Sequence, residues 1–180
     1  MNLSLRPIGL VLALLLAGTA SAAESQYLFL KGQRSGVIKG GVTVKGQEGA
    51  IQVDSVSHEI ISPRDPQSGL PTGQRMHKPF VVNVPVDKAW ALLYNVMTTN
   101  ENIAEFRLNV LTTTGSGTQA VSRFVRLTNA NISDIKQYTV DGTNGKPAHD
   151  ELQISFTYQK IEWTWTEGGL TAMDDWEARN

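Results

Sequence analysis

Residues 58–80 read HEIISPRDPQSGLPTGQRMHKPF and join two alternating apolar runs. This stretch holds four of the seven prolines of the chain, and each proline fixes φ and removes a backbone donor. We therefore expect residues 62–78 to form neither a ladder nor a helix. An irregular segment of this length is usually functional or disordered, and the apolar Leu70, Met76 and Phe80 argue against disorder. The sequence predicts a long extended arm loop over residues 62–79 that reaches outward to contact a partner.

The N-terminal segment has the pattern of a secretory signal peptide. Arg6 gives a short positive region, residues 8–17 are almost wholly apolar, and Ala20-Ser21-Ala22 supplies a cleavage motif. The apolar run is much shorter than the roughly 20 residues that a membrane span requires. We predict a signal peptide over residues 1–22, cleaved after Ala22 or Ala23, and one domain over residues 23–180. A buried N-terminal helix is the alternative.

Composition narrows the class of protein. The chain has 180 residues, a formal net charge of -1 and no cysteine. Because no long run of either charge is present, we expect neither nucleic acid nor an anionic membrane as a partner. The shortness of the apolar run predicts no stable membrane insertion. A secreted or periplasmic protein without disulfides must be held by its core, or by its neighbours in an assembly.

Strand patterns dominate the rest of the chain. Strands are expected at 27–31, 37–45, 50–61, 80–84, 106–111, 122–127, 132–140 and 152–165. The alternation changes phase near Ser55, which predicts a bulge or twist, and at Gln159-Lys160, which predicts a β-bulge. Because large aromatic side chains bury the most surface, we expect Trp163 and Trp165 at the structural centre.

One helix is expected, over residues 87–98. Asp87 is its predicted N-cap, and apolar residues recur from Ala89 to Met97 at three- and four-residue spacing. A single amphipathic helix among strands must lay its apolar stripe on a sheet or across the mouth of a barrel. The predicted fold class is therefore mainly β, a small antiparallel β-barrel with one flanking α-helix.

Catalytic and metal-binding patterns are weak in this sequence. The three histidines, His58, His77 and His149, have no metal-ligand spacing to one another, and there is no thiol to bind zinc. No G-x-S-x-G elbow or complete phosphate-binding loop occurs. We predict no catalytic residue, no metal and no cofactor, and interpret the chain as a structural or binding protein.

Four motifs together resemble one family. PRDPQSGLPTGQRMHKPF in the arm, KAWALLYN in the helix, YQKIEWTW in a late strand and DDW near the C-terminus are similar to the Hcp (haemolysin-coregulated protein) family. The likeness extends over roughly residues 26–180. Members of this family build the inner tube of bacterial type VI secretion systems. The resemblance implies a β-barrel with one helix, assembled as a hexameric ring that stacks, is secreted and carries effectors, with spike and sheath proteins as further partners.

The resemblance also implies interface residues. By likeness, the arm contacts a neighbouring subunit or ring, with a mobile surface loop as the alternative. The residues assigned to this interface are Pro63, Arg64, Asp65, Pro66, Gln67, Ser68, Gly69, Pro71, Thr72, Gly73, Gln74, Arg75, His77 and Lys78. A docking role is likewise implied for Asp174, Asp175 and Trp176, for which a solvated tail is the alternative.

The predicted signal peptide departs from the family pattern. A tube subunit is expected to polymerise in the cytoplasm inside a contractile sheath and needs no cleavable signal. The alternative function is therefore an exported periplasmic or extracellular Hcp-like binding module or secreted factor that acts independently of the sheath.

Overall fold

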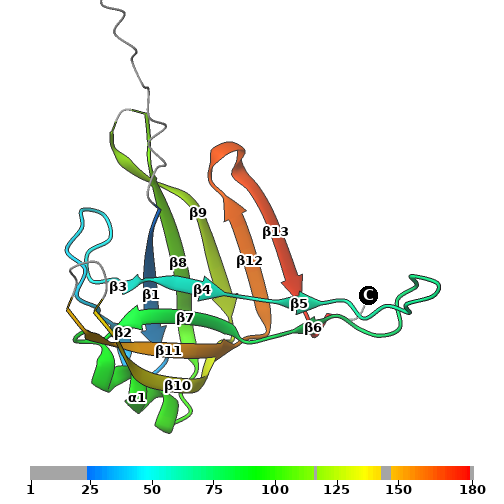
Figure 1. Ribbon diagram of the computed structural model, residues 1–180, viewed down its shortest axis with the longest axis horizontal. Helices are drawn as coiled ribbons and strands as arrows, with labels where there is room; N and C mark the ends of the chain where they lie inside the picture. Colours follow the sequence, from blue (N-terminus) through cyan, green and yellow to red (C-terminus); the bar gives the residue numbers. More distant parts are fainter. Residues whose placement is uncertain (1–23, 116, 143–146, 179–180) are drawn as a thin grey trace, which may run out of the picture.

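The computed structural model describes residues 24–115, 117–142 and 147–178. The predicted signal peptide and its cleavage site at Ala22 or Ala23 therefore lie outside the described residues. Two antiparallel sheets, one short two-stranded ladder and one α-helix make up the fold (Figure 1). The prediction of a mainly β fold with a single helix is confirmed.

The larger sheet has seven strands in the spatial order β13-β12-β9-β8-β1-β2, with β3 also paired to β1. Its strands are β1 (Ser25–Gly32), β2 (Gly36–Ile38), β3 (Ile51–Val53), β8 (Ile103–Thr113), β9 (Gln119–Thr128), β12 (Lys160–Trp165) and β13 (Leu170–Asp175). A short 3-10 turn, η1 (Glu167–Gly169), joins β12 to β13. The strand β13 had no counterpart in the sequence prediction.

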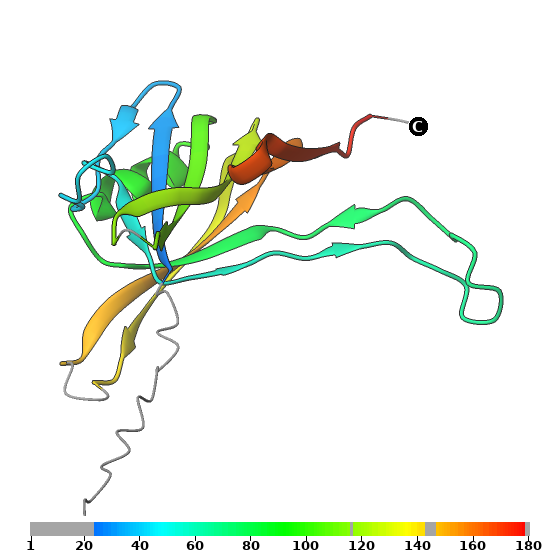
Figure 2. The same cartoon turned by 90° about the horizontal axis from the view of Figure 1, so that it is seen from above.

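The smaller sheet has four strands in the order β10-β11-β7-β4. Its strands are β4 (Ser55–Ser57), β7 (Phe80–Pro85), β10 (Asn131–Val140) and β11 (His149–Thr157). The β4–β7 pair continues outward as a separate two-stranded ladder between β5 (Ile60–Ile61) and β6 (Met76–His77). Figures 1 and 2 show this ladder leading into the arm, which projects away from the body of the protein.

The core lies between the two sheets. Buried residues of the larger sheet face buried residues of the smaller one across a cluster of three phenylalanine rings. The ring of Phe106 on β8 meets those of Phe80 and Phe156 edge-on, with centroid distances of 5.6 Å and 5.0 Å. Among the described strands no ladder joins the sheets into a closed cylinder, so the barrel-like body consists of two sheets around one core.

The chain passes from one sheet to the other where the sequence alternation changes phase. At Asp54 it leaves β3, which pairs with β1, and enters β4, which pairs with β7. At Tyr158 and Gln159 it leaves β11 and enters β12, which pairs with β9. A strand that changes sheet at a corner must change which face points into the core. The bulge expected at Gln159-Lys160 is therefore a crossing between sheets, and the bulges lie in other pairings, such as that of β8 with β9.

The central position expected for both tryptophans is wrong for Trp165. This side chain is 45% exposed, whereas Trp163 is half-buried and packs against the core. Figure 1 shows that β12 runs past the strands of the smaller sheet, so its last residue has no opposing layer to cover it. The centre is occupied instead by Phe106 and Phe156.

The helix α1 (Trp90–Thr98) begins later than expected. Its N-cap is Ala89, and no side chain caps it. Asp87 lies in the preceding turn, where its carboxylate accepts bonds from the backbone N–H groups of Ala89 at 2.8 Å and Gly41 at 2.7 Å. Leu93 and Val96 are buried, and the helix packs beside β10. The apolar stripe thus covers the core, as predicted. Within the part of the chain that the structure describes, no helix has the length and apolar character needed to cross a membrane.

Candidate functional site at the arm and its root

The arm is more ordered than the sequence suggested. Met76 and His77 pair with Ile60 and Ile61, so the expectation that residues 62–78 form no ladder is wrong at their C-terminal end. Further out, Arg64 and Pro71 form an isolated antiparallel bridge. The bonds flanking this bridge are Asp65 N–H to Leu70 C=O at 2.9 Å and Thr72 N–H to Pro63 C=O at 3.0 Å. Pro71 thus sits at a non-hydrogen-bonded pair, where its missing N–H costs nothing.

The tip of the arm is a tight turn organised by Asp65. One oxygen of its carboxylate accepts bonds from the N–H groups of Gln67 at 3.0 Å and Ser68 at 2.7 Å, and from the Ser68 hydroxyl at 2.8 Å. The bonds from Ser68, foremost its backbone N–H, lower the pKa of Asp65. Gly69 takes a φ of 71°, a left-handed conformation that glycine adopts without strain. The arm therefore has a defined shape out to its end.

Most of the arm is available for contact. Of the predicted interface residues, Pro63, Asp65, Arg75 and His77 are half-buried, and the others are exposed. Leu70, at the tip, is 65% exposed. A single exposed apolar side chain is ordinary on a protein surface, so it shows accessibility and does not identify a partner. The exposure fits the predicted role of these residues in contact with another chain.

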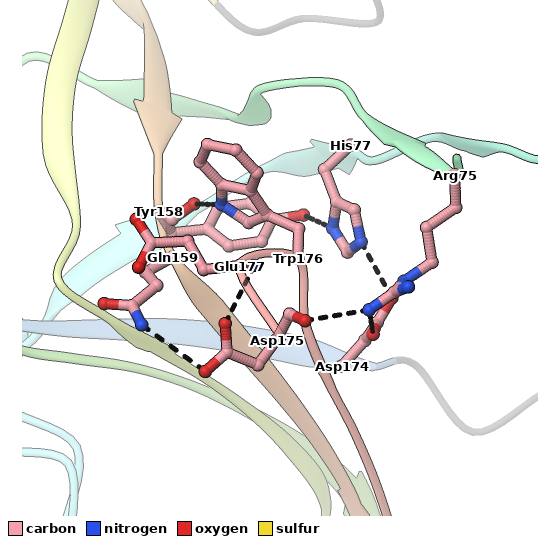
Figure 3. Close-up of polar contacts among 8 residues, drawn as sticks. All are labelled: Arg75, His77, Tyr158, Gln159, Asp174, Asp175, Trp176 and Glu177. Atoms are coloured by element: carbon pink, nitrogen blue, oxygen red, sulfur yellow. Dashed lines mark hydrogen bonds and ion pairs between the residues drawn. The ribbon is translucent and has the colours of Figure 1, made fainter. Parts of the chain in front are cut away.

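The arm is fastened to the end of the last strand. The Arg75 side chain donates from Nε to Asp174 Oδ2 at 2.5 Å and from Nη2 to the carbonyl oxygen of Asp175 at 2.8 Å (Figure 3). Its Nη2 also forms an ion pair with Asp174 Oδ1. His77 Nε2 lies 2.8 Å from Asp174 Oδ2. We call Arg75, His77, Tyr158, Asp174 and Trp176 the arm root, because they join the base of the arm to the corner between the sheets.

A continuous run of side-chain bonds crosses the arm root into the core. The Tyr158 hydroxyl lies 2.9 Å from His77 Nδ1 and 2.5 Å from His58 Nε2. Because the Asp174 carboxylate only accepts, Nε2 of His77 carries a proton. When the Tyr158 hydroxyl donates to His77 Nδ1, its oxygen accepts from His58 Nε2–H. Each polar atom in this run then has one complementary partner.

The electrostatics match this arrangement. The Arg75 guanidinium, helped by His77, holds the pKa of Asp174 below its usual range against the effect of burial. Burial, with a smaller contribution from Asp174, raises the pKa of Tyr158 to about 12. Burial, followed by the neighbouring His77, lowers the pKa of His58. These shifts favour an ionised carboxylate at Asp174 and the uncharged forms of Tyr158 and His58.

Trp176 closes the other side of the arm root. Its indole Nε1–H donates to the Tyr158 carbonyl oxygen at 2.6 Å, yet half of the residue remains exposed. With Met76, Pro79 and Lys78 it lines an open pocket of about 400 Å³ at the base of the arm. The structure therefore brings together two sets of residues that the sequence treated separately, the arm and the Asp174–Trp176 segment.

Sequence reasoning missed part of this site. Tyr158 and His58 fall in expected strands (152–165 and 50–61), and nothing in the sequence marks either as an interface residue. His58 and Tyr158 are 100 positions apart in the chain, and no local pattern connects them. Among the described residues, every buried side-chain nitrogen or oxygen has a hydrogen-bond partner. The arm root is thus a fully satisfied polar network of the kind that gives one defined conformation.

Comparisons with known proteins agree on one family. Residues 27–165 match the family model described as Type VI secretion system effector, Hcp. The Major exported protein of Pseudomonas aeruginosa is 36% identical over 168 residues, which cover 87% of this chain and 97% of that protein.

Solved structures give the same result. A crystal structure of an Hcp protein has a TM-score of 0.78 at 30% identity and covers 86% of this chain and 100% of its own. Hcp1 from E. coli EAEC 042 has a TM-score of 0.76 at 27% identity, with 86% and 99% covered. The secreted protein Hcp3 from Pseudomonas aeruginosa has a TM-score of 0.69 at 29% identity, with 84% and 99% covered.

Proposed function

This chain belongs to the Hcp family of type VI secretion system proteins, and from that premise we propose that it is a secreted tube-type subunit that assembles into rings. The observation that carries the proposal is the fastening of the arm by Arg75 and His77 to Asp174. An arm that is held in place at its base but exposed along its length makes few contacts within its own domain. Such pre-organisation favours contact with another chain, because less entropy is lost on docking.

The ring is proposed to be a homo-hexamer that stacks through the arm. A closed ring needs a heterologous contact, in which one surface of a subunit meets a different surface of the next. The arm supplies one such surface. The edge strand β13 supplies another, with Leu170 and Met173 exposed at 69% and 64%. An exposed apolar edge strand is an aggregation hazard unless another chain covers it, which supports an assembled state.

Within this proposal the C-terminal residues have distinct roles. Asp174 acts as a support for the arm, because its carboxylate is engaged by Arg75 and His77. Asp175 contributes its backbone carbonyl to Arg75. Trp176, half-exposed beside the pocket, is the member of the segment with surface left to dock against a partner.

We propose no catalytic activity. Tyr158, which has the strongest pKa shift at the arm root, is moved to about 12, away from the range in which a phenol acts as a base or nucleophile near neutral pH. The two ring nitrogens of His77 are engaged by Tyr158 and Asp174, and the Asp174 carboxylate is engaged by His77 and Arg75. Family membership alone supports spike, sheath and effector proteins as further partners.

The predicted signal peptide bears on the route of export, because a tube subunit that assembles in the cytoplasm needs no cleavable signal. Cleavage after Ala22 or Ala23 would make Ala23 or Glu24 the new N-terminal residue. The Glu24 carboxylate accepts two bonds of 2.7 Å from the guanidinium of Arg123 on β9, which ties this residue to the larger sheet. The second candidate function, a sheath-independent periplasmic or extracellular factor, is favoured by the same signal pattern.

The intact mass of the protein in culture medium separates the two functions. It should be measured in a normal strain and in one that lacks the contractile sheath, with a cytoplasmic marker as a control for lysis. Loss of the protein from the medium of the sheathless strain supports the tube subunit. A mass that begins at Ala23 or Glu24 in both strains supports the independent factor, and a full-length mass in either strain rules out cleavage.

A further inference from the structure

Three side chains of ligand type meet on the outer face of the smaller sheet. Asp54, His149 and Glu151 each offer one ligand atom, and these atoms all lie within 4.8 Å of one another. Side chains of a strand alternate between its two faces. The even-numbered residues of β11 are buried in the core at Leu152, Ile154 and Phe156, so the odd-numbered His149 and Glu151 lie on the outer face. Asp54 joins them from the corner where the chain crosses between sheets. This group is separate from the arm root.

The spacing suits a metal ion of small radius. His149 Nε2 and Glu151 Oε1 are 3.2 Å apart. Two ligands of a tetrahedral zinc ion, each about 2.0–2.2 Å from the metal, lie roughly 3.3–3.5 Å apart. This pair is therefore nearly at the ligand spacing already. Asp54 is exposed at the corner, so its carboxylate can approach by rotation of its side chain.

The ligand atoms have supporting bonds. The Tyr138 hydroxyl donates to Glu151 Oε2 at 2.8 Å, which leaves Oε1 directed toward His149. The Glu151 side chain is 13% exposed, so it is held by its surroundings rather than free in solvent. Bonds of this kind to the outer oxygen of a ligand orient it and are a regular part of protein metal sites.

Charge and ligand type favour a transition metal. Two carboxylates face one imidazole, and among the described residues no lysine or arginine forms an ion pair with Asp54 or Glu151. Within the described ranges, the ion-pair partner of Glu151 is His149. An imidazole ligand suits zinc, nickel and copper, whereas calcium and magnesium prefer oxygen ligands alone. The mixed nitrogen and oxygen set therefore selects against the two common hard cations.

We propose that Asp54, His149 and Glu151 bind one divalent first-row transition metal ion, with Zn²⁺ as the ion to test and water completing its coordination. The ion would tie the corner at Asp54 to the start of β11. It would therefore stabilise the fold at a place remote from the arm, whether or not the protein assembles into rings.

Titration calorimetry of untagged protein with ZnCl₂ tests this proposal. One ion per chain should bind, and the variants His149→Gln and Glu151→Gln should each weaken binding by about tenfold or more. Asp150→Asn is the matched control. It removes a neighbouring charge on the opposite face of β11, where the Asp150 carboxylate accepts from the Thr139 hydroxyl at 2.7 Å.

The outcomes are distinct. The site is supported if Zn²⁺ affinity falls in the two ligand variants and is unchanged in Asp150→Asn. It is also supported if Zn²⁺ raises the melting temperature, EDTA reverses the rise, and His149→Gln abolishes it. Absence of saturable binding overturns the proposal, as does binding unchanged by both ligand variants. Equal affinity for Ca²⁺ would overturn the assignment to a transition metal. His149 is 42% exposed, so its replacement should leave the fold intact.

Discussion

The guanidinium of Arg75 and the carboxylate of Asp174 form an ion pair that joins the base of the arm to the last strand, 99 positions later in the sequence. The pair is partly shielded, with side-chain exposures of 29% and 23%. Together with the pairing of β5 and β6, it holds the base of the arm against the body. The proposed assembly depends on this contact, because a loosely held arm would lose more entropy on docking.

Replacement of Asp174 by asparagine should loosen the arm while leaving the body folded. The variant keeps the shape of the side chain but removes the charge that holds Arg75 and His77. We expect several-fold faster cleavage by trypsin at Arg64 and Arg75, since proteolysis reports local opening. Limited proteolysis under native conditions measures this directly.

Asp175→Asn is the control for that experiment. The Asp175 carboxylate bonds with Gln159 and with the N–H of Glu177, and its contact with Arg75 is made by the backbone carbonyl, which the variant retains. Equal cleavage rates in the two variants would contradict the supporting role of the Asp174 carboxylate.

Tyr158→Phe should cost stability even though the ring is kept. The hydroxyl bridges His58 and His77. Its loss leaves His58 Nε2 and His77 Nδ1, both shielded from solvent, without their partner. An unpaired buried polar group costs about 1–3 kcal/mol. Urea denaturation of the variant measures the difference. Tyr94→Phe on α1, outside this run of bonds, is the control, and an equal effect in both variants would mean that the bridge contributes nothing.

Stability should fall as the pH drops below about 6.5, the ordinary pKa of histidine. Burial and His77 lower the pKa of His58 in the folded state, so the unfolded chain binds a proton at higher pH than the folded chain does. The free energy of unfolding then decreases between pH 6.5 and the lowered pKa. Urea denaturation at several pH values measures the slope. In His58→Gln the free energy of unfolding should depend less steeply on pH. An unchanged slope would mean that other groups cause the pH dependence.

Below that window a second loss is expected from Asp174. Its pKa is lowered in the folded protein, so its contribution is present above the ordinary value for aspartate and is lost as the pH falls through the folded pKa. The Asp174→Asn variant should lack this acid-side component. If the stability of Asp174→Asn falls with pH as steeply as that of the natural sequence, the Asp174 carboxylate does not contribute to the loss at acid pH.

The pair Phe106 and Phe156 should be the most sensitive point of the core. Their rings join the two sheets edge-on, with centroids 5.0 Å apart, and both residues are almost fully buried. Phe156→Ala should destabilise the fold by about 3–5 kcal/mol. Denaturant unfolding provides the measurement, and Trp165→Ala, at a residue with 45% exposure, should cost much less. A larger loss of stability for Trp165→Ala than for Phe156→Ala in the unassembled protein would contradict the central position of the phenylalanine pair.

Much of the fold was predictable, because both sheets leave a period-two pattern wherever one face is buried. The phase changes near Ser55 and Tyr158 were visible, but a phase change alone does not distinguish a bulge from a crossing between sheets. The strand β13 was missed because its first four residues are exposed on both faces, so burial imposes no alternation. Trp165 was misplaced because the length of β12 relative to the opposing sheet is a tertiary property.

The candidate site was predictable only in its parts. Composition and the family resemblance identified the arm and the Asp174–Trp176 segment, but their contact depends on how the corner at Tyr158 turns. The pair His149 and Glu151 carries a weak signal, since residues two apart on a strand share a face. Asp54 lies in the bend between β3 and β4, far from them in sequence, and only the folded structure joins it to them.

The native mass of the purified, signal-free protein at micromolar concentration tests the central claim most directly. We expect a hexamer for the natural sequence, with a shift toward monomer in the Asp174→Asn variant and none in Asp175→Asn. A monomer at this concentration for the natural sequence would contradict ring assembly, and a hexamer unaffected by Asp174→Asn would contradict the role of the arm root.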